Sequence, residues 1–192
     1  MSRATGSRVA LRPWLDGDLG LLQRLLGDPA MMAHLGGPES PQAIEARHQR
    51  YLHPDDSIGG LFAVVVEDET RPAESSPEPP AAERRVGWVG FWETDWDGGG
   101  AWEAGWSVLP EFQGRGVATA ATALLLDRAR DDGTYQFVYA FPRVGNVASN
   151  ALCHTLGFEL IGEADVEYPK GHVSRSLAWR YDLQAQTRSG AR

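Results

Sequence analysis

The sequence predicts an α+β fold, and three observations carry that prediction. Short segments rich in β-branched and aromatic residues alternate with amphipathic helical segments. Two pairs of these strand segments follow one another closely enough to pair antiparallel, and a further strand leads through a glycine-rich loop into a helix. The chain has 192 residues and 42% hydrophobic content, enough for one sizeable core. We therefore expect a single domain over residues 1–192, with its core at 9–183.

The N-terminal third predicts one strand followed by two helices. Residues 9–14 have the composition of a strand, and Asp16 stands at the N-cap of a helix that Asp28 and Pro29 end. The apolar face of this helix consists of Leu19, Leu22, Leu25 and Leu26. A second helical segment covers residues 41–51.

Two strands of β-branched and aromatic residues, 61–67 and 85–92, should then pair antiparallel. The segment between them, 70–83, is rich in proline, alanine and acidic residues and cannot build a core. We expect it to be a mobile loop inserted at the surface. Residues 95–100 predict a turn before the next strand, 102–109.

The segment after this strand predicts an anion site. Beyond Pro110 the chain cannot continue as a central strand, and Gly114 and Gly116 allow a tight turn without side chains over the amides. A helix follows, whose apolar face comprises Val117, Ala121, Leu124, Leu125 and Ala129. Unpaired amides at its start favour a phosphate, and they belong to Gly114, Arg115, Gly116, Val117 and Ala118. The loop is neither a Walker A loop nor a Rossmann fingerprint, and an ordinary strand-to-helix turn would use the same glycines.

The C-terminal part predicts one more helix among three strands. Residues 135–141 form a buried strand, and 146–158 contain a short helix that ends at a glycine in the left-handed cap position. Segments 159–167 and 175–183 alternate well enough to make a terminal antiparallel pair, and residues 184–192 form a frayed tail.

Two of these segments carry a family resemblance. Gln113-Gly-Arg-Gly-Val-Ala118 matches the pattern Gln/Arg-x-x-Gly-x-Gly/Ala, and the segment from Asn146 to Phe158 is similar to Asn-x-x-Ala/Ser followed by Leu-Gly-Phe. Both patterns resemble signatures of the GNAT superfamily of N-acetyltransferases, and they occur in the family's order. The resemblance implies a three-layer, GNAT-like fold with a mixed, mostly antiparallel central sheet, splayed strands and flanking helices.

The resemblance further implies an activity. Acetyl-CoA would be the cosubstrate, and its acetyl group would pass to a primary amine by direct attack in a ternary complex. Residues 11–19, Asp28-Pro29 and 35–38 are similar to the branch that contains ribosomal-protein N-terminal acetyltransferases. Because that branch also contains enzymes for small amines and antibiotics, the acceptor stays open between a protein N-terminus and a small molecule.

Individual roles follow from the same resemblance. Glu103 would accept the proton of the amine, with Glu93 on the neighbouring strand as a weaker candidate. A bulge near Ser107 and Val108 would turn the Val108 amide toward the thioester oxygen, and Asn146 would contact the pantetheine or the substrate. The expected cofactor-binding residues are Val108, Gln113, Gly114, Arg115, Gly116, Val117, Ala118 and Asn146.

Cys153 stands where many relatives have a tyrosine that protonates the departing thiolate. A cysteine is a poor substitute for a phenol, so we interpret Cys153 as a packing residue and leave the general acid unassigned. This departure keeps a second hypothesis open, a GNAT-like acyl-CoA-binding module without turnover. A nucleotide-binding α/β domain is the third.

Charge and composition exclude several classes of binding partner. The formal net charge of −8 argues against a nucleic-acid surface and provides no polybasic segment for a membrane. No apolar run indicates a membrane span or a signal peptide, so we expect a cytoplasmic protein. One cysteine and five histidines without ligand spacing predict no metal site, although His172 is expected to border the acceptor pocket. The expected partners are the amine and a second copy of the chain in a homodimer.

Overall fold

A seven-stranded sheet forms the centre of the computed structural model, which describes residues 8–55, 57–67 and 83–185. The strand order is β1-β2-β3-β4-β5-β7-β6. The strands are β1 (Arg8–Pro13), β2 (Gly60–Glu67), β3 (Arg84–Trp96), β4 (Gly99–Val108), β5 (Phe137–Ala140), β6 (Glu159–Glu167) and β7 (Val173–Asp182). All neighbouring strands pair antiparallel except β4 and β5, which are parallel.

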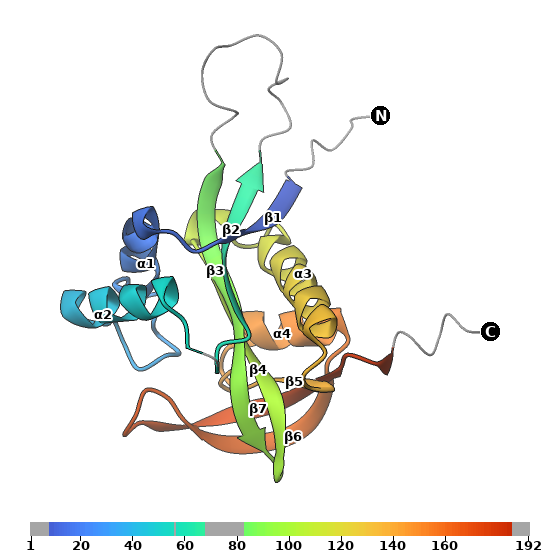
Figure 1. Cartoon of the computed structure of the whole chain (residues 1–192). Coiled ribbons are helices and arrows are strands. Elements are labelled where there is room, and N and C mark those ends of the chain that lie inside the picture. Colours follow the sequence, from blue (N-terminus) through green and yellow to red (C-terminus); the bar gives the residue numbers. More distant parts are fainter. Residues whose placement is uncertain (1–7, 56, 68–82, 186–192) are drawn as a thin grey trace, which may run out of the picture.

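Helices cover both faces of the sheet (Figure 1). They are η1 (Asp16–Asp18), α1 (Leu19–Leu26), α2 (Pro41–Leu52), η2 (Pro110–Phe112), α3 (Val117–Asp132) and α4 (Val147–Leu156). A smaller hydrophobic cluster packs α1 and α2 on one face, and a larger cluster packs α3 and α4 on the other. The predicted fold class and the predicted order of strands and helices are confirmed.

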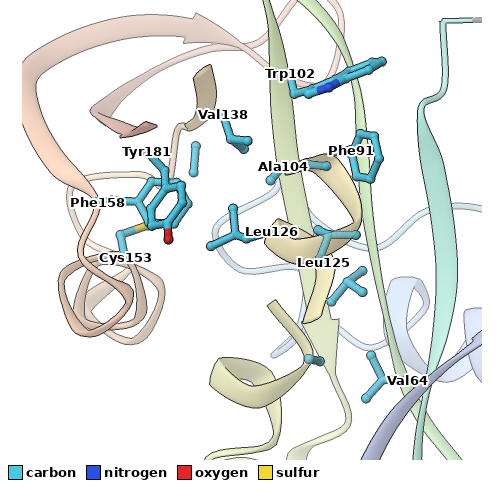
Figure 2. Packing of buried hydrophobic residues seen from close by; sticks show 14 of the residues in the cluster. Val64, Phe91, Trp102, Ala104, Leu125, Leu126, Val138, Cys153, Phe158 and Tyr181 are labelled. Carbon is cyan, nitrogen blue, oxygen red and sulfur yellow. The ribbon is translucent and has the colours of Figure 1, made fainter. Parts of the chain in front are cut away.

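The larger core lies under α3, where aliphatic residues meet aromatic residues of β3, β4 and β7 (Figure 2). The buried stripe of α3 follows four-residue spacing through Val117, Ala121, Leu125 and Ala129, as predicted. Leu124 does not belong to it, because that side chain is 37% exposed. A helix turns by about 100° per residue, so Leu126 occupies the core on the other side of the stripe.

The start of α1 corrects the sequence prediction. Asp16 does not cap the helix, because a 3₁₀ turn at Asp16–Asp18 moves the start of α1 to Leu19. Asp18 has the structural role instead, and it is only 1% exposed. Its Oδ2 accepts the Leu15 amide at 2.8 Å and Nη1 of Arg85 at 2.7 Å. This carboxylate therefore fastens the chain before α1 to β3.

We expect Asp18→Ala to lower the free energy of unfolding by about 3 kcal/mol, because it removes a buried hydrogen-bonded charge and leaves the Arg85 guanidinium without its carboxylate partner. Urea denaturation measures this loss. Asp16→Ala is the matched control, since the Asp16 side chain is 97% exposed, and its effect should stay within about 0.5 kcal/mol. Equal losses in both variants would contradict the assignment.

Other boundaries differ by a few residues. The predicted turn at 95–100 is a two-residue hairpin of Asp97 and Gly98, with φ of 55° and 76°, so β3 and β4 are longer than expected. Positive φ at both positions is typical of a type I′ turn, whose twist suits a hairpin. The predicted mobile loop at 70–83 lies, apart from Glu83, outside the described residues, as does most of the predicted tail.

Candidate active site

The central feature of the site is the divergence of β4 and β5. The two strands pair only at Trp102 with Val138 and at Glu103 with Tyr139. β4 then continues to Val108, five residues beyond its last partner on β5. The backbone of this segment therefore faces a gap on one side, where an extended molecule can add its own hydrogen bonds.

The amide of Val108 points into this gap. The Leu109 amide donates to the Val86 carbonyl at 2.8 Å, so it faces β3. Successive residues of a strand alternate in direction, and the N–H and C=O of Val108 therefore face away from β3. The predicted bulge near Ser107 and Val108 is wrong, because β4 pairs with β3 without a register shift. The end of β5 leaves this amide free, and no bulge is needed.

The loop between β4 and α3 presents several uncommitted amides. Gly114 and Gly116 have φ of 68° and 77°, and a Cβ built at either would meet nothing within 4 Å. Hydrogen bonds are recorded for the flanking amides of Phe112, Gln113 and Ala120. Within the described part of the chain none is recorded for the amides from Gly114 to Ala118. An exposed row of donors at the start of a helix fits a diphosphate.

Glu103 lies on the opposite face of the sheet from α3. Trp102 and Ala104, its neighbours on β4, are in the core under α3, so strand alternation places Glu103 on the face of α1 and α2. Burial raises the pKa of this half-buried carboxyl, while hydrogen bonding from the side chains of Trp92 and Thr94 opposes the rise. A carboxylate in this environment is a better proton acceptor than an exposed glutamate.

Glu93 occupies a different environment. It pairs with Trp102 across β3 and β4, so its side chain lies on the α3 face. Its carboxylate is exposed and accepts the Tyr135 hydroxyl at 3.0 Å. The structure thus places the two candidate glutamates on opposite faces of the sheet.

Aromatic residues flank Glu103 on both sides. In the sheet register Trp92 stands opposite Glu103 on β3, and Tyr139 stands opposite it on β5. Trp96 reaches across β4, with its ring 6.0 Å from Tyr139 and 4.5 Å from Phe141. Trp92 and Trp96 are among several strand tryptophans that could line an acceptor cleft, and the sequence alone could not say which of them do, because their proximity to Glu103 depends on the register of three strands.

The start of α4 is held by its own polar residues. The Oδ1 of Asn146 accepts the Ser149 amide at 3.1 Å, so Asn146 is the N-cap of the helix. Ser149 Oγ accepts the indole of Trp106 at 3.3 Å, and Asn150 Oδ1 accepts the indole of Trp179 at 2.8 Å. Ser149 and Asn150 therefore tie α4 to the sheet, and neither side chain caps the helix.

Cys153 is fully buried beside Phe158 and Tyr181 (Figure 2). Burial raises the pKa of its thiol to about 12. This position agrees with the interpretation as a packing residue. It also means that the side chain is closed off from the gap between β4 and β5.

We expect Cys153→Ala to lower the free energy of unfolding by about 1 kcal/mol, since it removes only a buried sulfur, and to change the transfer activity that the resemblance implies by no more than about twofold. In the native protein the thiol should not react with Ellman's reagent at pH 8, because the side chain is fully buried and burial raises the pKa of the thiol, which disfavours the reactive thiolate. A hundredfold loss of transfer in a folded variant would instead make Cys153 the proton donor.

A hollow of about 370 Å³ lies between the α1–α2 connection, α2 and the β6–β7 turn. Its lining includes Gly36, Arg47 and Tyr168, and Nη2 of Arg47 donates to the Tyr168 hydroxyl at 3.2 Å. His172 lies in the same β6–β7 turn but outside this lining, and its position beside the acceptor stays a prediction. Among the described residues no three His, Cys, Asp or Glu side chains gather as a metal site. Nor is any described helix long and apolar enough to cross a membrane.

Comparison with known proteins agrees with this geometry. A family model described as an acetyltransferase (GNAT) domain matches residues 8–159. A spermidine N-acetyltransferase from Vibrio cholerae, in complex with CoA and spermine, is similar in structure with a TM-score of 0.68 and 21% identity. The match covers 92% of this chain and 96% of that one.

Two further structures have different acceptors. An aminoglycoside acetyltransferase in complex with coenzyme A matches with a TM-score of 0.67 and 16% identity over 96% of this chain and 100% of that one. RimL, a ribosomal L7/L12 alpha-N-protein acetyltransferase, matches with a TM-score of 0.65 and 18% identity over 93% and 92%. At these identities the likeness establishes the fold and leaves the acceptor open.

Proposed function

Because the chain belongs to the GNAT acetyltransferase family, we propose that it is an acetyl-CoA-dependent N-acetyltransferase acting on a primary amine. One observation carries the proposal: the uncommitted amides from Gly114 to Ala118 lie at the end of a strand whose outer edge is unpaired. This arrangement offers a diphosphate site and an adjoining edge for an extended amide-containing chain. Acetyl-CoA has both parts and supplies the acetyl group as a thioester.

Different residues would bind the cosubstrate and catalyse the transfer. The amides of Gly114, Arg115, Gly116, Val117 and Ala118 would hold the diphosphate, and Asn146 would contact the pantetheine from the start of α4. The Val108 amide would donate to the thioester oxygen as negative charge develops there, which lowers the barrier to acyl transfer by about 3 kcal/mol in comparable sites. Glu103 would accept the proton of the attacking amine, directly or through water.

The acceptor side favours a cationic amine. Trp92 and Tyr139 flank the Glu103 carboxylate, and aromatic faces attract an ammonium group before it loses its proton. The net charge of −8 adds a weak attraction at long range. A small-molecule amine and a protein N-terminus both satisfy these conditions.

The buried thiol of Cys153 favours one alternative, a GNAT-like module that binds acyl-CoA without turnover. It leaves the position of the usual proton donor without an ionisable group that reaches the gap. Release of the thiolate unaided, or its protonation by water, is compatible with turnover, and we therefore retain the enzyme as the leading proposal.

A thiol-release assay with acetyl-CoA and a panel of diamines, aminoglycosides and peptides with free N-termini tests the proposal. We expect release with at least one amine class, and mass spectrometry should find the acceptor heavier by one acetyl group. Tight binding of acetyl-CoA without release across the panel would favour the binding module. Preferential binding of ATP or NAD would favour a nucleotide-binding domain.

A further inference from the structure

Gln113 begins the loop between β4 and α3, yet its side chain turns back toward β4. Its Nε2 donates to the Val108 carbonyl at 2.8 Å and lies 3.3 Å from the sulfur of Met31. The side-chain amide therefore points away from the row of loop amides that begins at Gly114. The sequence pattern had placed Gln113 among the cofactor-binding residues.

The bond matters because of the place it occupies. The Val108 carbonyl faces the gap, on the side where β5 no longer accompanies β4. A central strand would find its partner there on the next strand. Here a side chain supplies the donor, so Gln113 takes the place of the missing β5 backbone for one hydrogen bond.

This bond completes the restraint of Val108. The peptide after Val108 is held at one end by the Leu109 amide, which donates to the Val86 carbonyl at 2.8 Å. It is held at the other end by Gln113. The peptide before Val108 is held through the pairing of Ser107 with Trp88. Because the peptides on both sides of Val108 are held, its N–H bond is fixed in one orientation, toward the gap between β4 and β5.

We propose that Gln113 is a positioning residue that aims the Val108 amide and couples it to the phosphate loop. This inference rests on the proposed function, in which that amide donates to the thioester oxygen. Gln113 acts through Val108 and does not itself bind the cosubstrate. A donor that is misaimed by a fraction of an ångström loses much of its effect on the barrier, whereas the diphosphate site keeps its own amides.

Gln113→Met removes the donor while keeping the length of the side chain and adds no charge. For this variant we expect kcat to fall about 30-fold while the Kd for CoA, measured by calorimetry, stays within about threefold. Gln113→Arg restores N–H donors and should recover most of the lost kcat. Gln42→Glu, an exposed glutamine on α2, is the control and should match the wild type in both constants.

A second readout does not require turnover. The Leu109 amide belongs to the same peptide as the Val108 carbonyl and donates to Val86, so its hydrogen exchange reports whether that peptide is held. Its exchange, followed by NMR without cosubstrate, should become about tenfold faster in Gln113→Met and stay unchanged in Gln42→Glu. Unchanged exchange would overturn the positioning role, and so would a rise in the Kd for CoA with kcat intact. A wild type that binds CoA but never releases thiol would contradict the proposed enzymatic function. Faster exchange in Gln113→Met would still support the role of Gln113 in positioning Val108.

Discussion

Gly116→Glu is expected to abolish binding of acetyl-CoA, with a loss of affinity of about 100-fold or more. Gly116 is the N-cap of α3 and has φ of 77°, and the space beside its Cα is open. A glutamate there would place a carboxylate among the amides proposed to hold the diphosphate. It would compete for the same donors and repel the phosphates. Calorimetric titration with CoA measures the effect directly.

The other end of α3 provides a matched control. Gly133 is the C-cap of the same helix, has φ of 73° and likewise has open space beside its Cα. Gly133→Glu therefore introduces the same backbone strain, about 1–2 kcal/mol, and the same charge. The variant should lose folding stability but keep its affinity for CoA. If both variants bind CoA equally well, the loop from Gly114 to Ala118 is not the diphosphate site.

The sequence predicted the turn at Gly114 and Gly116 and the start of α3 because both depend on local properties of the chain. Gly114, Gly116 and the helix that starts at Val117 require only the conformational freedom of glycine and the spacing of apolar residues. The structural role of Asp18, whose carboxylate binds the Leu15 amide and Arg85, was missed because it depends on a contact distant in the sequence. Asp16 and Asp18 both suit a helix start, and the choice between them depends on Arg85, which arrives from a distant strand.

The sequence could predict the position of a site residue only where the alternation of side chains along one strand was enough to place it. The position of Glu103 on β4 followed from the sequence, but its neighbours Trp92 and Tyr139 follow from the register of three strands. The predicted bulge at Val108 was wrong because β4 pairs with β3 in continuous register, and the early end of β5 leaves the same amide free instead. The short length of β5 could not be read from a segment that looked like a strand over residues 135–141.

Glu103→Gln is expected to lower kcat/KM for the amine about 100-fold and to leave the Kd for CoA unchanged, because it removes the proton acceptor and no group that faces the diphosphate. Amines with a low pKa, which are already neutral at the assay pH, should lose much less. Glu93→Gln is the matched control, since Glu93 lies on the other face of the sheet and pairs with Tyr135. Equal activity of the two variants would remove Glu103 from the mechanism.

The direction of the Glu103 pKa shift gives two further tests. Activity needs the carboxylate form, so the midpoint of the acidic limb of the pH–rate profile should lie above the ordinary glutamate pKa of about 4.3. This limb should disappear in Glu103→Gln. Because burial raises the pKa, the folded state binds this proton more tightly than the unfolded state. As pH rises from the pKa of Glu103 in the unfolded chain to its raised pKa in the folded chain, this carboxyl therefore lowers the free energy of unfolding, and above that range the loss is complete. At pH 7 Glu103→Gln should then be at least as stable as the wild type in urea denaturation, which separates a catalytic loss from unfolding. A variant that is both inactive and markedly less stable would contradict the proposed role.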